Sequence, residues 1–159
     1  MKKNIRLVLL GEFVLFLFTF LFTIFQINGD LSSIVWFIDF PSLILIMLIF
    51  IPGMLIMGEW KNFIRSFSVG IKTYSLLELK NILGAVVAAQ RMIIFGSLFS
   101  MITAGIIVLG MFNDPTRIGP NLAVCILSGF YCVVFEFFLF PLRLNAESKM
   151  NEEMDLGDE

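Results

Sequence analysis

The sequence contains no histidine and only two cysteines, and charged residues make up 15% of its 159 positions. Without histidine, the chain lacks the most common metal ligand and the usual general base at neutral pH. It also lacks a glycine-rich phosphate loop, a cysteine cluster and a nucleophile placed beside a base. We therefore expect no catalytic residue, no metal site, no cofactor and no enzymatic activity.

The two cysteines, Cys125 and Cys132, lie seven residues apart in one apolar segment. At that spacing on a helix they are too far apart to form a disulfide with each other. The formal net charge of -2 is too small to indicate a nucleic-acid partner. These shortages exclude most classes of soluble protein chemistry.

What the chain has in excess is apolar surface. Hydrophobic residues make up 58% of it, with 19 phenylalanines, whereas soluble domains are about 45–50% apolar and about 25% charged. About 20 helical residues cover the roughly 30 Å hydrocarbon core of a bilayer. Four apolar stretches reach that length, at about 7–27, 34–58, 92–112 and 118–142. The sequence thus predicts an all-α membrane protein in which residues 1–144 form a single domain of four transmembrane helices.

The basic residues predict the orientation of these helices. All but one of the 11 lysines and arginines lie before the first span, between the second and third, or after the fourth. The exception, Arg117, lies between the third and fourth spans. Because cytoplasmic loops of membrane proteins are enriched in lysine and arginine, we expect both termini and residues 59–91 to be cytoplasmic.

The segment 59–91 carries apolar residues at helical spacing, and Ser75 and Glu78 have the spacing of a capping box. We expect a helix to start near Leu76 and continue into the third span, so that the second and third helices extend into the cytoplasm as an antiparallel pair. The alternative is an amphipathic stretch lying on the membrane surface. Residues 145–159 contain six acids and one lysine, and we expect a disordered, solvated tail.

Polar and small residues follow helical spacing within three of the spans. They are Glu12, Thr19, Thr23 and Gln26 beside Phe16 in the first; Gly96, Ser100, Thr103 and Gly110 beside Ile107 in the third; and Cys125, Gly129, Cys132 and Glu136 in the fourth. Such residues face protein or water, because lipid offers no hydrogen-bond partner. Close helix packing is one interpretation of these stripes, and a functional face is the other.

The segment that joins the last two spans adds a family resemblance. Residues 95–142 contain Asp114, Pro115, Ile118, Gly119 and Pro120, followed by Ala123, Leu127, Ser128, Tyr131 and Pro141. In this order they resemble the last two membrane helices of the MotA/TolQ/ExbB family of ion-driven motors, and MotA most closely. The stretch FIDFPSLILI, residues 37–46, is similar to the start of the second MotA helix.

The resemblance implies a subunit of a motor or stator in the bacterial inner membrane, with five copies around a dimer of a single-span partner like MotB or ExbD. In that arrangement the third and fourth helices line a central space, and proton or sodium flow is coupled to mechanical work. The implied ion-pathway residues are Ser100, Thr103, Ser128 and Glu136. The residues implied to pack on partner helices are Gly96, Gly110, Cys125, Gly129 and Cys132, while Asp114, Pro115, Gly119 and Pro120 form the signature of the turn.

The sequence departs from the family in ways that leave two alternatives open. The cytoplasmic domain through which flagellar MotA contacts its rotor is reduced here to residues 59–91. The glycine–threonine pair of the third helix reads Phe99-Ser100, and the paired threonines of the fourth read Ser128-Gly129. The first alternative is therefore a scaffold of the same fold that does not conduct ions. The second is a small four-span transporter of the multidrug type that uses Glu12.

Overall fold

The computed structural model describes residues 5–28, 32–111 and 115–157. Within these ranges most residues are helical, and the one β-type contact is an isolated bridge between Val69 and Lys72. The helices are α1 (Ile5–Asn28), η1 (Ser32–Phe37), α2 (Phe40–Ile56), α3 (Trp60–Ser66), α4 (Leu76–Gly110) and α5 (Pro115–Gly157). Four helical stretches are long and apolar enough to cross a membrane. The expectation of an all-helical, multi-pass membrane protein is therefore confirmed.

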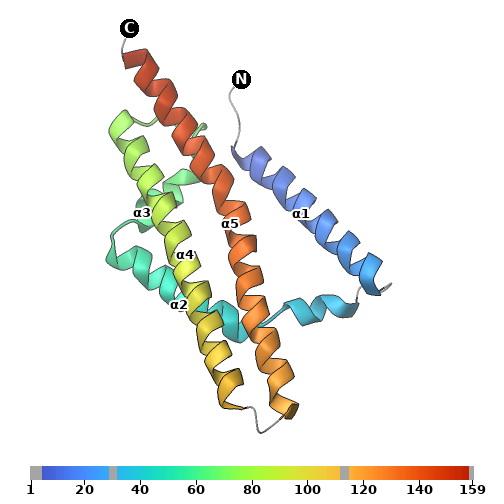
Figure 1. Cartoon of the computed structure of the whole chain (residues 1–159). Helices are drawn as coiled ribbons and strands as arrows, with labels where there is room; N and C mark the ends of the chain where they lie inside the picture. The colour runs from blue at the N-terminus through green and yellow to red at the C-terminus, as the bar shows by residue number, and fades with distance from the viewer. Residues whose placement is uncertain (1–4, 29–31, 112–114, 158–159) are drawn as a thin grey trace.

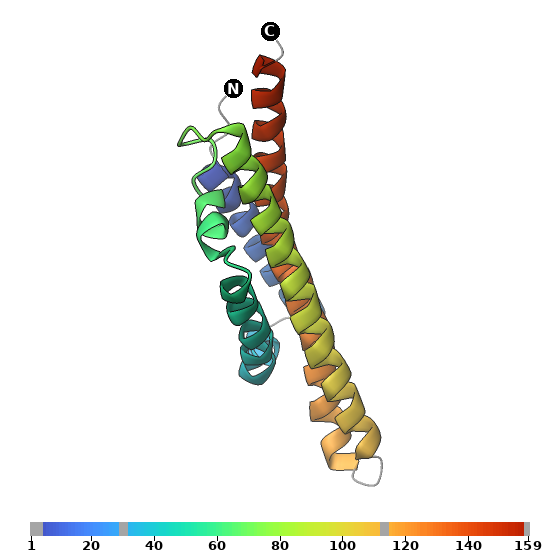
Figure 2. The same ribbon diagram turned by 90° about the vertical axis from the view of Figure 1, so that its left-hand side faces the viewer.

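The two longest helices, α4 and α5, form an antiparallel hairpin around which the rest of the chain is arranged (Figure 1). With 35 and 43 residues they are about 52 and 65 Å long, so both exceed the roughly 30 Å hydrocarbon core. Helices α2 and α3 lie on one side of this hairpin (Figure 2). The start of α1 and the end of α5 lie at the same end of the molecule.

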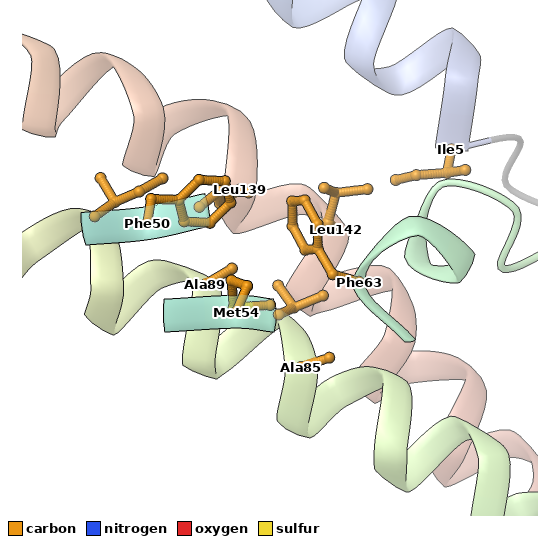
Figure 3. Close-up of a cluster of buried hydrophobic side chains, with 10 residues drawn as sticks. Ile5, Phe50, Met54, Phe63, Ala85, Ala89, Leu139 and Leu142 are labelled. Carbon is orange, nitrogen blue, oxygen red and sulfur yellow. The ribbon is translucent and has the colours of Figure 1, made fainter. Parts of the chain in front are cut away.

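Buried side chains from five helices meet in one core (Figure 3). Its members are Ile5, Phe50, Met54, Phe63, Ala85, Val86, Ala89, Ile93, Leu139 and Leu142. Outside this core, many large apolar side chains of the spanning helices are exposed in the isolated chain, as expected for surfaces that contact lipid or other membrane helices.

Helix α1 diverges from α5 (Figure 1). Phenylalanine rings connect the two helices. The ring of Phe16 lies 6.0 Å from that of Phe137 and 5.7 Å from that of Phe138. Further along α1, the ring of Phe20 lies 5.0 Å from Phe37 and 5.9 Å from Phe130. Aromatic contacts therefore fix the position of α1 against α5 and η1.

The start of α4 agrees with the sequence prediction. Ser75 is the N-cap, its hydroxyl accepts a hydrogen bond from the Glu78 backbone N–H, and the Glu78 carboxylate accepts one from the Ser75 backbone N–H. This capping box satisfies two donors that the first turn leaves without helical partners. From Leu76 the helix continues without a break to Gly110, as expected.

The second predicted span, 34–58, differs from the structure because it is not one helix. Asp39 accepts a hydrogen bond from the Ser42 backbone N–H and separates η1 from α2, with Pro41 in the first turn. Gly58, at φ +71°, ends α2, because the N–H groups of Gly58 and Glu59 bond back to Leu55 and Met54. The prediction that this helix is prolonged beyond residue 58 was therefore wrong.

The predicted turn signature falls partly outside the described residues, since Asp114 is not among them. Helix α5 begins at Pro115, where the missing N–H of proline costs no helical hydrogen bond. Gly119 and Pro120 therefore lie inside the first two turns of α5 instead of starting the helix, as the sequence had suggested.

Residues 145–157 are helical in the structure, where a disordered tail was expected. Asn145 donates a hydrogen bond from Nδ2 to the Val69 carbonyl oxygen at 3.0 Å, and Ala146 is fully buried with Val69, Leu79 and Ile82. These contacts anchor the beginning of the acidic segment to residues 69–82. The acidic composition of the segment had predicted disorder. A few apolar side chains on one face are nevertheless enough to hold a helix that is otherwise charged.

Candidate functional site

Three serines from three helices meet in the interior of the bundle. Ser128 Oγ on α5 lies 2.8 Å from Ser100 Oγ on α4 and 3.1 Å from Ser42 Oγ on α2. All three side chains are at most 1% exposed. We call Ser42, Ser100 and Ser128 the serine cluster. It brings together two predicted ion-pathway residues, Ser100 and Ser128, and encloses both within a single chain.

The hydroxyl groups of the cluster can form hydrogen bonds with one another. Ser128 Oγ also lies 2.9 Å from the Val124 carbonyl oxygen, one turn earlier on α5. A hydroxyl donates one proton and accepts up to two. If Ser100 donates to Ser128, then Ser128 donates to either Ser42 or Val124. The cluster therefore joins α2, α4 and α5 by hydrogen bonds in an apolar environment.

A close approach of α2 to α4 brings Ser42 to this position. A Cβ added at Gly96 would lie 3.1 Å from the Ile46 carbonyl oxygen and 3.2 Å from the Ile46 Cα. Only glycine leaves room for the two backbones at this distance. The structure thus places Gly96 in a contact within the chain, with α2, although the resemblance had implied packing on a partner helix.

A tyrosine joins the corner between η1 and α2 to α5. The hydroxyl of Tyr131 donates to the Phe37 carbonyl oxygen at 2.8 Å and accepts from the Asp39 backbone N–H at 2.6 Å. Tyr131 is 7% exposed. It therefore fixes the entry of α2 about one turn of α5 away from Ser128.

The acid of the fourth span, Glu136, is hydrogen-bonded to a glutamine of α4. Its Oε2 accepts a hydrogen bond of 2.8 Å from Gln90 Nε2 on α4. Its Oε1 is buried and has no hydrogen-bond partner among the described residues, and the same holds for Ser97 Oγ on the same helix pair. A buried polar atom without a partner is costly, so these two atoms mark places for water or another donor.

The other residues of the predicted stripes are more open. Thr103 is partly exposed, and Ile107 and Gly110 are exposed. Added Cβ atoms at Gly110 or Gly129 would meet nothing within 4 Å. These two glycines, unlike Gly96, are therefore not needed for contacts within the chain.

The cysteines and the first stripe take no part in the serine cluster. Cys125 Sγ lies 3.5 Å from the Met101 carbonyl oxygen, and both Cys125 and Cys132 are free thiols. In α1, Phe16 faces α5, but Thr19, Thr23 and Gln26 are exposed. Thr23 bonds back to the Thr19 carbonyl oxygen of its own helix.

Ser42, Gln90 and Ser97 also belong to the polar interior, although they were not predicted from the sequence. Gln90 and Ser97 continue the spacing that leads to Ser100 and Ala104, so the helical period extended toward residue 90 would have indicated them. Ser42 follows the N-cap Asp39 by three residues, and local sequence gives no sign that its hydroxyl meets α4 and α5. Such a contact depends on tertiary packing.

Among the residues that the structure describes, no group of three or more histidine, cysteine, aspartate or glutamate side chains could hold a metal ion. No family model, no curated protein and no solved structure matches this chain.

Proposed function

We propose that this chain is the repeating membrane subunit of an ion-driven machine of the MotA/TolQ/ExbB type. Several copies, five by the resemblance, surround a dimer of a single-span partner in a bacterial inner membrane, with both termini of each copy in the cytoplasm. Proton or sodium flow through the assembly is coupled to mechanical work. The observation that supports this proposal best is a side of the α4–α5 hairpin that the described helices leave uncovered.

This side faces away from α2. It consists of Ile94, Leu98 and Met101 on α4 and of Ile126, Val133 and Phe137 on α5, all of them exposed. We call these six residues the open face. Helix α2 contacts the hairpin at Gly96 and Ser128, which are not among these six residues. Helix α1 reaches the border of the open face, where the ring of Phe16 lies 6.0 Å from that of Phe137. The resemblance implies that the third and fourth membrane helices, here α4 and α5, line a central space. Such helices need a face that the rest of the subunit leaves exposed.

Two of the predicted residues border the open face. Gly129 precedes Val133 by one turn of α5, Glu136 precedes Phe137, and both are partly exposed. Because a Cβ at Gly129 would meet no other helix within 4 Å among the described residues, another helix can approach closely there. We therefore assign the contact with neighbouring helices to the region of Gly129 and the titratable position of the ion path to Glu136.

The burial of the serine cluster reduces the number of predicted residues that can contact the ion. Ser100 and Ser128 are enclosed and bonded to each other, so neither reaches an ion outside the subunit unless α2 moves away. Glu136 and Thr103 are partly exposed and need no such movement. Of the four predicted pathway residues, these two are retained in the proposal as groups that meet the ion.

Proton flux into vesicles tests this proposal. The protein is purified together with its partner, reconstituted, and compared with Glu136→Gln and with Ser100→Ala. We expect the flux to be lost in Glu136→Gln, which removes the titratable group, and to be kept in Ser100→Ala. Equal flux through the wild type and Glu136→Gln would exclude the assigned path.

A second candidate is a scaffold of the same fold that does not conduct ions. The observation in its favour is that the open face is apolar, while the hydroxyls of Ser100 and Ser128 are satisfied inside the chain. The same experiment separates the two functions. A scaffold forms the assembly but gives no flux even as the wild type, under conditions where a known proton carrier gives a full signal.

A further inference from the structure

A second polar site lies between the start of α1 and the end of α5, away from the serine cluster. It is a cavity of about 430 Å³ whose lining includes the apolar residues Ile5, Val8, Pro141 and Leu144 and the polar residues Glu12, Asn145, Ser148, Lys149 and Glu152. Ligand pockets in proteins commonly have volumes of about 300–1,000 Å³. The cavity is therefore large enough for a small polar group with part of an apolar chain attached.

The carboxylate of Glu12 lacks a hydrogen-bond donor in this cavity. Its Oε2 is buried and has no hydrogen-bond partner among the described residues. A carboxylate oxygen only accepts hydrogen bonds when ionised, and leaving it buried and unpaired costs free energy. A ligand that brings a positively charged N–H donor would supply the missing partner.

The position of the cavity along the helices indicates where such a ligand comes from. Glu12 and Pro141 lie inside the first and fourth apolar stretches, whereas Ser148, Lys149 and Glu152 lie six or more residues beyond the fourth. At about 1.5 Å per residue, the distance along α5 from Pro141 to Lys149 is about 12 Å. The cavity thus extends across the boundary between hydrocarbon and headgroups, where lipid headgroups lie.

The charges around the cavity select among lipid headgroups. Lys149 pairs with Glu152, so Glu12 is the acid without a cation among the side chains that line it. An ammonium ion has three N–H donors, and Lys149 therefore retains donors for an anion beside its bond to Glu152. An anionic headgroup without an amine would leave Glu12 unpaired, and a quaternary amine has no N–H to donate.

We propose that this cavity holds the headgroup of a membrane phospholipid with a primary ammonium group, the ammonium against Glu12 and the phosphate against Lys149. The acyl chains leave past the apolar lining residues Ile5, Val8, Pro141 and Leu144. The bound lipid fills the space between α1 and α5 and thereby holds the start of α1 in place. This proposal is independent of ion conduction and of the number of subunits.

The test counts retained lipids by native mass spectrometry. The purified protein is placed in bilayers that contain equal amounts of phosphatidylethanolamine, phosphatidylcholine and phosphatidylglycerol with the same acyl chains. We expect the wild type to retain phosphatidylethanolamine over phosphatidylcholine by about fivefold or more, since hydrogen bonds to charged groups are among the stronger ones. Equal retention of the three lipids would overturn the proposal, and this measurement needs no variant.

Three variants test the assigned contacts. Glu12→Gln keeps the size of the side chain and removes its charge, so the preference should fall to about one. Lys149→Gln should lower the retention of all three lipids, because each carries a phosphate, and should leave the preference unchanged. Glu147→Gln, an exposed acid on α5 outside the cavity lining, is the control and should behave as the wild type. An unchanged preference in a folded Glu12→Gln variant would contradict the assignment.

Free phosphoethanolamine separates a lipid from a soluble amine as the ligand. The two share the same headgroup chemistry, but only the lipid has acyl chains that can contact the apolar lining residues. We expect millimolar phosphoethanolamine to leave the retained lipid in place. Displacement of the lipid would show that the cavity takes a soluble amine, and the lipid proposal would fail.

Discussion

At the scale of single residues, the glycines of the membrane helices differ in whether they allow close contact with another helix. A Cβ at Gly96 would lie within 3.2 Å of the backbone of α2, whereas one at Gly84, on the same helix, would meet nothing within 4 Å. The two positions have the same residue type and similar sequence surroundings. Only the structure distinguishes a glycine that allows contact from one that does not.

We expect Gly96→Ala to destabilise the protein and Gly84→Ala to leave it unchanged or more stable. The first methyl group forces α2 away from α4, at a cost of about 1–3 kcal/mol in the free energy of unfolding. The second gains helix propensity, worth at most about 1 kcal/mol. Unfolding of both variants in the same detergent measures the difference, and equal stability would mean that the close approach at Ile46 is absent.

The serine cluster makes a prediction about coupling between helices. Ser42→Ala and Ser128→Ala each remove one hydroxyl of the serine cluster. The loss in free energy of unfolding in the double variant should therefore be smaller than the sum of the losses in the two single variants. Hydrogen bonds between membrane helices contribute about 0.6 kcal/mol on average, with a maximum near 1.7. A double-mutant cycle in detergent measures this coupling energy. Additive effects would show that the two hydroxyls do not interact.

How far the sequence predicts such residues depends on whether the contact is local. Spacing placed Gly96 and Ser100 on a stripe of the third span, and the resemblance pointed to Ser128; all three residues are buried in the structure. Spacing did not show which neighbour each stripe faces. The resemblance implied a pore or a partner helix, whereas the structure places Ile46 beside Gly96 and Ser42 beside Ser128. That choice depends on helix arrangement, which a stripe on one helix does not contain.

At the scale of helices, local signals predicted the start of α4 but missed other helix boundaries. The capping box at Ser75 and Glu78 placed the first residue of α4 correctly. The break at Asp39 and the stop at Gly58 were missed, because both lie in apolar surroundings that read as one continuous span. The helical end of α5 was missed for the opposite reason, since its acidic composition outweighed a small buried face around Ala146.

The end of α5 therefore offers a test of order in the acidic segment. We expect trypsin to cleave slowly after Lys149 in the wild type, because the helix must open before the protease can act. Ala146→Asp places a charge in a fully buried position and should speed this cleavage by at least about tenfold.

Asn151→Asp adds the same charge at an exposed position of the same helix and is the matched control. It should leave the cleavage rate close to that of the wild type. Fast cleavage of the wild type, at the rate of an unfolded peptide, would favour the disordered tail that composition suggested.

At the scale of the whole molecule, the open face predicts assembly through α4 and α5. Gly129→Leu should leave the single chain folded, since nothing lies within 4 Å of a Cβ there, but should block the approach of a neighbouring helix. Gly11→Leu is the control on α1, where a Cβ also meets nothing within 4 Å. The copy number of each purified variant is read by native mass spectrometry. Loss of assembly in both variants, or in neither, would argue against the open face as the contact.

The most direct test of the account is a particle reconstruction of the purified wild-type protein, read for the number of copies and for the helices that form the contact. We predict five copies with α4 and α5 innermost, and with Gly129 and Glu136 facing the neighbouring helices. A single copy, a dimer, or a ring in which α1 and α2 line the centre would contradict the proposed function.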